Sequence, residues 1–279
     1  MLAILIFFAG CAAFLLAAAA VVDSGARWVP DYGKIDLAAS TATPRGEWTD
    51  EDYKALTMQT GILSREALDE LPVEWLELYQ NAFFFEGTVR HDAIIPGFSF
   101  QDLLFDPATD EVFYATVVHL YPGDVVVTSS THTLGYRHGH SALILSNDRM
   151  LQSISAGAKS RASYLNEIEE GLFWYLRCTN FMVLRLKDAS AETRKEIADL
   201  ADEQLQGIPY SLTVGIFSKK NQGASPGQTH CAHLVWQAFK NCGYDVDADG
   251  GPVVTPRDIA RSEHFEVVQV YGFDPEKLW

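Results

Sequence analysis

Basic residues are scarce in this chain of 279 residues, in which 21 Lys and Arg stand against 37 Asp and Glu and the formal net charge is −16. A surface of this sign repels phosphate backbones, so we expect no nucleic-acid partner. Cysteine is scarce as well, with four residues in all. They are too few and too irregularly spaced for a disulfide framework or a four-cysteine zinc site.

One long apolar run is present at the N-terminus. Residues 2–22 carry no charge and are long enough to span a bilayer, so we expect residues 1–22 to be a cleaved signal peptide, a retained membrane anchor, or a lipoprotein signal acylated at Cys11. Each of the three places the remainder outside the cytoplasm, in contact with a membrane only through this segment. Residues 23–48 contain Gly, Pro, Ser and Thr without sustained periodicity and are predicted to be a linker.

The pattern turns helical after the linker. Thr49 precedes acidic residues and Ser64 precedes a second apolar stripe, which is typical of helix starts. We therefore expect a helical N-terminal extension over residues 49–117, packed on a domain of residues 118–279. His91, within the extension, is interpreted as a surface or packing residue.

The second part of the chain alternates short β-branched runs with helical stripes, which predicts an α+β domain with an antiparallel sheet packed on helices. The run Ser141–Leu145 is apolar on both faces and is expected to be central. The other expected strands are 125–128, 150–154, 181–186 and 265–271, and the expected helices are 190–206 and the one that begins at Cys231.

Cys231 follows a run rich in Gly, Ser and Pro at residues 221–228 and opens a stripe at helical spacing. Its thiol would lie in the first turn on the inward face, near unpaired N–H groups at the positive end of the helix dipole. Such a place favours the reactive thiolate. A small buried cysteine that merely starts an amphipathic helix fits this segment equally well.

A cysteine nucleophile needs a base, and the base needs an acceptor on its second ring nitrogen. His230 and His233 flank Cys231, but neighbours one or two positions apart on a helix point away from each other. His140 stands at the entry of the central strand, and the paired strand supplies Gln152. The predicted catalytic set is therefore Cys231, His140 and Gln152.

Three further residues are candidates for substrate contact. His138 shares the strand parity of His140 and is the reserve choice for the base. Tyr210 precedes the nucleophile helix and is expected to line the cleft, as is His230. The backbone N–H of Cys231 would be one oxyanion donor, and the second donor stays unassigned.

Several short motifs agree in order and spacing with the permuted papain-like amidases, the YaeF/YiiX-type circularly permuted relatives of the NlpC-type cell-wall hydrolases. The resemblance spans roughly residues 120–272, with a looser match at residues 59–61. The matching motifs are Gly123-Asp124, the His140-Ser-Ala-Leu-Ile strand, Gln152, the Thr229-His-Cys-Ala-His-Leu-Val-Trp helix start and Val254-Thr-Pro-Arg-Asp-Ile.

This resemblance implies a permuted papain-like fold and a Cys–His–polar triad that hydrolyses amide bonds, with peptidoglycan stem peptides as the substrate suggested by the relatives. By position, Cys231 matches the nucleophile, His140 the base and Gln152 the third residue. That third position is often acidic in the family, and a neutral Gln stabilises the imidazolium less. Ala232 stands where relatives frequently have Ser.

Other interpretations stay open. The same triad could act on lipid esters or amides, or the domain could be a non-catalytic wall-binding module. A zinc site could form from His138, His140 and Cys231, or with His230 and His233, although no Glu is placed to act on metal-bound water. Cys178 and Cys242 could pair. We expect no metal and no cofactor for the hydrolase itself, and the oligomeric state is open.

Overall fold

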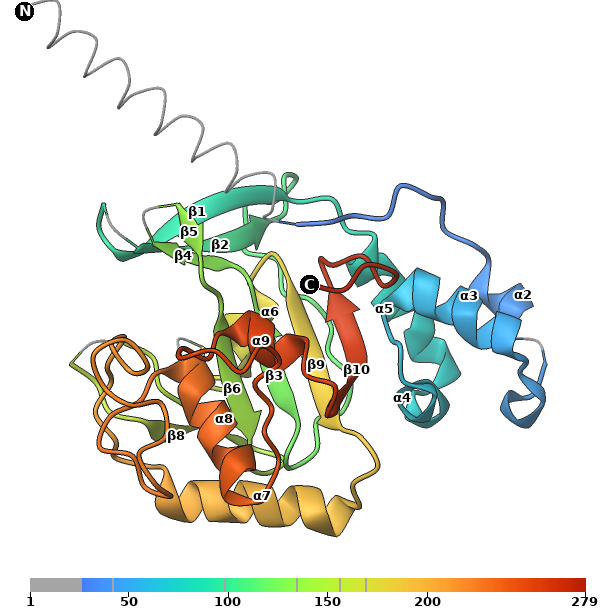
Figure 1. The fold of residues 1–279 in the computed structure, drawn as a ribbon. Helices are drawn as coiled ribbons and strands as arrows, with labels where there is room; N and C mark the ends of the chain where they lie inside the picture. The colour runs from blue at the N-terminus through green and yellow to red at the C-terminus, as the bar shows by residue number, and fades with distance from the viewer. Residues whose placement is uncertain (1–26, 42, 98, 134, 156, 169) are drawn as a thin grey trace, which may run out of the picture.

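The computed structural model describes residues 27–279 except 42, 98, 134, 156 and 169 (Figure 1). The N-terminal apolar segment and Cys11 lie outside the described residues. No helix among the described residues has the length and apolar content to cross a membrane. The described chain combines antiparallel sheets with packed helices, which confirms the predicted α+β class.

A six-stranded antiparallel sheet forms the centre of the molecule, in the order β10-β9-β3-β6-β7-β8. Its strands are β3 (Val125–Thr128), β6 (His140–Ile144), β7 (Arg149–Gln152), β8 (Arg161–Tyr164), β9 (Phe181–Leu186) and β10 (Phe265–Tyr271). β6 is buried at every position, because β3 and β7 flank it and both sheet faces are covered. The predicted central strand is thus confirmed.

Alternate residues of the sheet enter two different cores. Val125 and Val127 belong to the core beneath α7 (Ala191–Gln204) and α8 (Cys231–Asn241), whereas Val126 belongs to the core beneath the N-terminal helices. This division follows from the two-residue period of a strand, which sends neighbouring side chains to opposite faces. Figure 1 shows α7 and α8 together on one side of the sheet.

The N-terminal helices begin where the sequence predicts. Thr49 caps α3 (Asp50–Thr60) through a capping box with Asp52, and Ser64 caps α4 (Arg65–Glu70). The remaining short helices of the described chain are α2 (Leu37–Ser40), η1 (Arg45–Glu47), η2 (Val73–Trp75), α5 (Leu76–Phe83), α6 (Leu172–Leu176) and α9 (Pro256–Ala260). The N-terminal group of helices therefore ends near residue 83, with α5.

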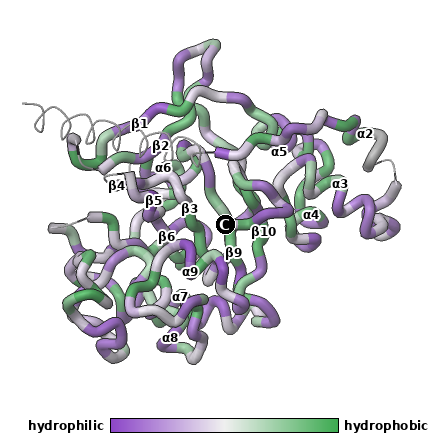
Figure 2. Tube along the Cα trace, turned by 45° about the horizontal axis from the view of Figure 1, so that its top comes forward, coloured by the Kyte–Doolittle hydropathy of each residue, from purple (hydrophilic) through white to green (hydrophobic). Residues whose placement is uncertain are grey.

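The prediction of a helical extension through residue 117 is wrong for its second half. β1 (Thr88–Ile95) and β2 (Ser99–Phe105) form a hairpin there, which β4 (Thr131–Thr133) and β5 (Tyr136–Arg137) extend into a second sheet. Pro96-Gly97 supplies the turn, and the β-branched Ile94 and Ile95 precede it, which together favour strands over a helix. Figure 2 shows a hydrophobic stretch at this hairpin turn.

A buried ion pair lies at the central sheet, and its arginine also contacts an N-terminal helix. Arg185 on β9 donates from Nε and Nη2 to the two carboxylate oxygens of Asp124, both at 2.9 Å. Its Nη1 lies 3.3 Å from a carboxylate oxygen of Glu66 on α4. Since both Arg185 and Asp124 are almost completely buried, removing either partner would leave an uncompensated charge in the core.

Candidate functional site

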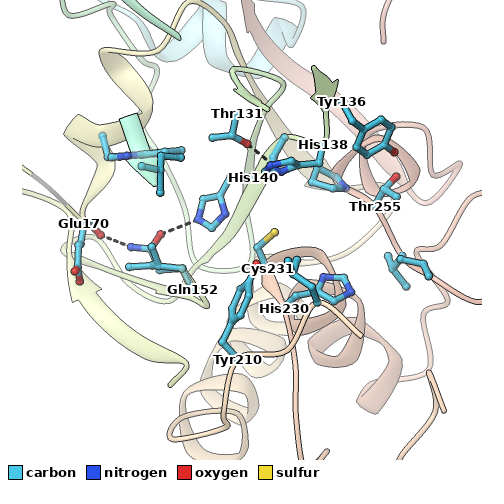
Figure 3. Close-up of a pocket in the computed structure, with 18 residues that line it drawn as sticks. Thr131, Tyr136, His138, His140, Gln152, Glu170, Tyr210, His230, Cys231 and Thr255 are labelled. Carbon is cyan, nitrogen blue, oxygen red and sulfur yellow. Dashed lines mark hydrogen bonds between the residues drawn. The ribbon is translucent and has the colours of Figure 1, made fainter. Parts of the chain in front are cut away.

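A cavity of about 210 Å³ opens between the start of α8, the entry of β6 and the second sheet. Its lining includes the three predicted catalytic residues, Cys231, His140 and Gln152. It also includes the three candidates for substrate contact, His138, Tyr210 and His230. Figure 3 shows these residues around one space, with the Cys231 sulfur directed into it. The structure thus brings together all six residues selected from the sequence. Most of the remaining lining is apolar or aromatic: Ile94, Tyr136, Ile154, Trp174, Leu212, Val253, Val254 and Pro256.

Cys231 is the first residue of α8, as the sequence predicts, and only 9% of it is exposed. Burial raises the pKa of its thiol to about 11, and hydrogen bonds from Ser141 and Ala232 offset only part of that effect. Desolvation therefore outweighs the helix N-terminus. The prediction of a thiolate is therefore wrong for the resting site, in which the thiol is neutral at physiological pH.

His140 begins β6 and is held by its neighbours on several sides. Its Nε2 lies 3.2 Å from Oε1 of Gln152 on β7. The ring stacks on Tyr175 at 5.8 Å between centroids and meets the edge of Trp174 at 5.1 Å. Burial in this aromatic surround lowers the pKa of His140 to about 4, so the imidazole is neutral at physiological pH.

The amide of Gln152 has only one orientation that satisfies its neighbours. Its Nε2 donates to Ser163 Oγ at 3.3 Å and to the backbone oxygen of Glu170. These two acceptors fix the amino group away from His140 and leave Oε1 to accept the His140 Nε2–H. The lone pair of His140 is then on Nδ1, and Figure 3 shows the ring lying between Gln152 and the Cys231 sulfur.

His138 is engaged elsewhere and is poorly suited to be the base. Its Nδ1 lies 2.9 Å from the Gly139 oxygen and 3.3 Å from Thr131 Oγ1, and its Nε2 lies 3.0 Å from Thr133 Oγ1. Gly139 has φ +75°, and a Cβ there would lie 2.4 Å from the Thr128 oxygen. Only glycine fits this turn, which separates the two histidines and directs His140 into the sheet.

The two histidines beside the nucleophile differ in their surroundings. His233 is fully buried, with Thr229 Oγ1 2.9 Å from Nδ1 and the Lys220 oxygen 2.8 Å from Nε2. His230 caps α8: its Nδ1 accepts from the His233 N–H at 3.4 Å. Its Nε2 has no hydrogen-bond partner among the described residues, although His230 lines the cavity.

The alternative zinc site is not supported by the positions of its ligands. In the described part of the chain, the groups of three ligand atoms close enough for one ion are His91–Asp102–His132 and Asp247–Asp249–Asp258. Neither group contains Cys231 or the histidines proposed with it. Cys178 and Cys242 are free thiols, so the possible disulfide between them is absent as well.

Several contributors were not selected from the sequence. The His140 ring packs against Tyr175 and Trp174. The thiol of Cys231 is contacted by Ser141. The amide of Gln152 is oriented by Ser163 and Glu170. Ser141 directly follows His140, so its contact could have been sought. The others lie on segments whose approach depends on the tertiary fold, and no local pattern marks them.

No protein-family model matches the chain. The uncharacterized protein YycO of Bacillus subtilis is 28% identical over 144 residues, which are 51% of this chain and 53% of YycO, so the match spans about half of that relative. A solved structure described as metalloprotein YiiX from Escherichia coli O157:H7 aligns with 54% of this chain and 97% of its own, at 16% identity and a TM-score of 0.38. Membership of the permuted papain-like amidases stays a prediction.

Proposed function

We propose that this chain is a cysteine hydrolase that cleaves an amide through an acyl-enzyme on Cys231. The observation that carries the proposal is the buried His140 ring, hydrogen-bonded at Nε2 to Gln152 and lining one cavity with the Cys231 thiol. The nucleophile, a neutral base and a residue that fixes the tautomer of that base are the three parts such chemistry requires.

The reaction starts from the neutral pair. His140 Nδ1 takes the thiol proton as the Cys231 sulfur attacks the carbonyl carbon. The resulting imidazolium gives that proton to the amine nitrogen as the C–N bond breaks, which leaves a thioester on Cys231. His140 then removes a proton from water, the hydroxide attacks the thioester, and the proton returns to the departing sulfur. Gln152 accepts the Nε2–H throughout.

His230 is the proposed second oxyanion donor, beside the backbone N–H of Cys231. Because Nδ1 of His230 accepts the cap hydrogen bond, a neutral ring carries its proton on Nε2. Burial lowers the pKa of His230 to about 3, which keeps the ring neutral. Its unpartnered Nε2–H is therefore available to a substrate oxygen at low desolvation cost.

Peptidoglycan stem peptides outside the cytoplasm are the substrate that the family resemblance suggests. Purified muropeptides incubated with the protein, followed by mass spectrometry, test this directly. New fragments are expected with the wild-type chain and not with Cys231→Ala, while both give the same thermal unfolding curve. Cleavage at an undiminished rate by Cys231→Ala would end the cysteine mechanism.

A second substrate class, lipid amides and esters, is favoured by the apolar mouth of the cavity. Ile94, Tyr136 and Leu212 line the cavity yet are 42%, 67% and 64% exposed, and Phe217 nearby in sequence is 87% exposed. An acyl chain that covers such surface gains about 0.8 kcal/mol per buried CH₂. A charged wall peptide has less apolar surface to bury there and gains less.

Acyl amides of increasing chain length separate the two substrate classes. If the cavity binds acyl chains, kcat/KM rises with each added CH₂ by up to about fourfold until the cavity is full. Leu212→Ser flattens this rise, whereas Leu78→Ser, at a similarly exposed position on α5, leaves it unchanged. A kcat/KM independent of chain length, together with muropeptide cleavage, favours the wall substrate.

A further inference from the structure

Two histidines and a carboxylate converge on the second sheet, away from the catalytic cavity. His91 lies on β1, Asp102 on β2 and His132 on β4, and these three strands are neighbours in the sheet. His91 Nδ1 is 2.7 Å and His132 Nε2 is 3.0 Å from the same oxygen, Asp102 Oδ1. All three ligand atoms lie within 4.8 Å of one another.

The buried carboxylate of this cluster has a cationic partner besides the two imidazoles. Asp102 is fully buried, and Arg137 Nη1 lies 2.6 Å from its other oxygen, Oδ2. That ion pair already compensates the buried carboxylate. The convergence of two imidazole nitrogens on Oδ1 is therefore not needed to satisfy the charge, and it matches the spacing of ligand atoms around one ion.

We propose that His91 Nδ1, His132 Nε2 and Asp102 Oδ1 bind a divalent transition-metal ion of the zinc class. Two imidazoles and one carboxylate suit zinc, with water in the remaining position. The side chain of His91 is 41% exposed, so the ion can enter from solvent and keep a water ligand. Each imidazole binds through a lone pair and keeps its proton on its other nitrogen.

This ion would support the wall of the catalytic cavity rather than take part in the reaction. Neighbours of His132 on β4 point the opposite way, and the hydroxyls of Thr131 and Thr133 contact His138, which lines the cavity. An ion on the far side of β4 would tie β1, β2 and β4 together behind that wall. Binding of this ion does not depend on the proposed hydrolysis.

Cobalt titration tests the site, because Co²⁺ occupies zinc sites and absorbs visible light. The full chain is stripped with a chelator and titrated with Co²⁺, then with Zn²⁺ in competition. One equivalent is expected to bind, with a spectrum that lacks the sulfur-to-cobalt charge transfer of a thiolate ligand. Zn²⁺ is also expected to raise the thermal unfolding midpoint.

Three variants locate the ion. His91→Ala is expected to weaken binding at least tenfold and to abolish the thermal shift, and it leaves the buried Asp102–Arg137 pair intact. His119→Ala, which removes an exposed histidine elsewhere, and Cys231→Ala are expected to bind like the wild type. Unchanged binding by His91→Ala, loss of binding in Cys231→Ala, or no binding by the wild-type chain would each overturn the site.

Discussion

The ionisation of Cys231 gives the sharpest test of the resting site. Burial raises the pKa of this thiol from 9.0 to about 11, a difference of two units. At any pH below about 9, the thiolate fraction is then about a hundredfold smaller than that of an unperturbed thiol. Alkylation proceeds through the thiolate, so Cys231 reacts slowly with iodoacetamide near neutral pH.

Transfer of the thiol proton to His140 does not make the thiolate a major species. Because the pKa of the thiol is about 11 and that of the imidazole is about 4, moving the proton between them costs about 9.5 kcal/mol of free energy. Even for two charges in direct contact, taken as about 4 Å apart, attraction returns only about 4 kcal/mol at an effective dielectric constant of about 20. The neutral pair still dominates by about 10⁴ to one.

Peptide mapping by mass spectrometry measures the alkylation rate of Cys231 as a function of pH. The rate is expected to rise about tenfold per unit from about pH 7 to pH 9 and to level off below pH 7 at the small ion-pair fraction. A single-cysteine peptide supplies the reference. A rate at pH 7 that matches or exceeds the reference would contradict the neutral pair, because only a preformed thiolate–imidazolium pair makes a buried thiol react that fast at neutral pH.

Three further predictions follow from residues around the cavity. The pKa of His140 falls from 6.5 to about 4 on folding, so the protonated unfolded chain is favoured as pH falls from about 6.5 to about 4, and the free energy of unfolding drops by about 3 kcal/mol. In urea unfolding, His140→Gln should lose about 3 kcal/mol less than the wild type over the same pH range. Gln152→Ala frees the His140 ring to change tautomer and should lower kcat about a hundredfold with little effect on KM in steady-state assays. Gly139→Ala should destabilise the chain by more than about 2 kcal/mol in urea, because its Cβ meets the Thr128 oxygen, whereas Gly207→Ala, with a similar φ of +77° and open space, should cost about 1 kcal/mol; equal losses would contradict the steric explanation.

The sequence predicts the second half of the fold well because its elements carry strong local signals. The stripe after Cys231 and the cap at Ser190 each define a helix, and the apolar run after His140 defines the central strand. The β1–β2 hairpin was missed because the exposed β1 does not show a clear two-residue alternation of burial. Tertiary pairing with β4 stabilises it, and no local pattern reveals that pairing.

The site is predictable in its residue types and less so in its electrostatics. His140 and Gln152 could be selected because neighbouring strands bring them together, and their hydrogen bond is present. The helix start at Cys231 suggested a thiolate, but burial raises the pKa of the thiol. That burial is set by the tertiary fold, which also brings Tyr175 and Tyr210 close enough for the charge of Cys231 to raise their pKa values. The sequence likewise gives no sign that His91 belongs to a ligand cluster, because Asp102 comes opposite it only through the register of β1 and β2.

Trapping of the acyl-enzyme tests the central claim most directly. The full chain is mixed with an activated acyl ester, quenched in acid and mapped by peptide mass spectrometry, with His140→Ala and Cys231→Ala in parallel. We expect one acyl group in thioester linkage on Cys231 in the wild type, much slower labelling without His140, and none on Cys178 or Cys242. Turnover with no adduct on Cys231, or turnover that survives Cys231→Ala, would contradict the account.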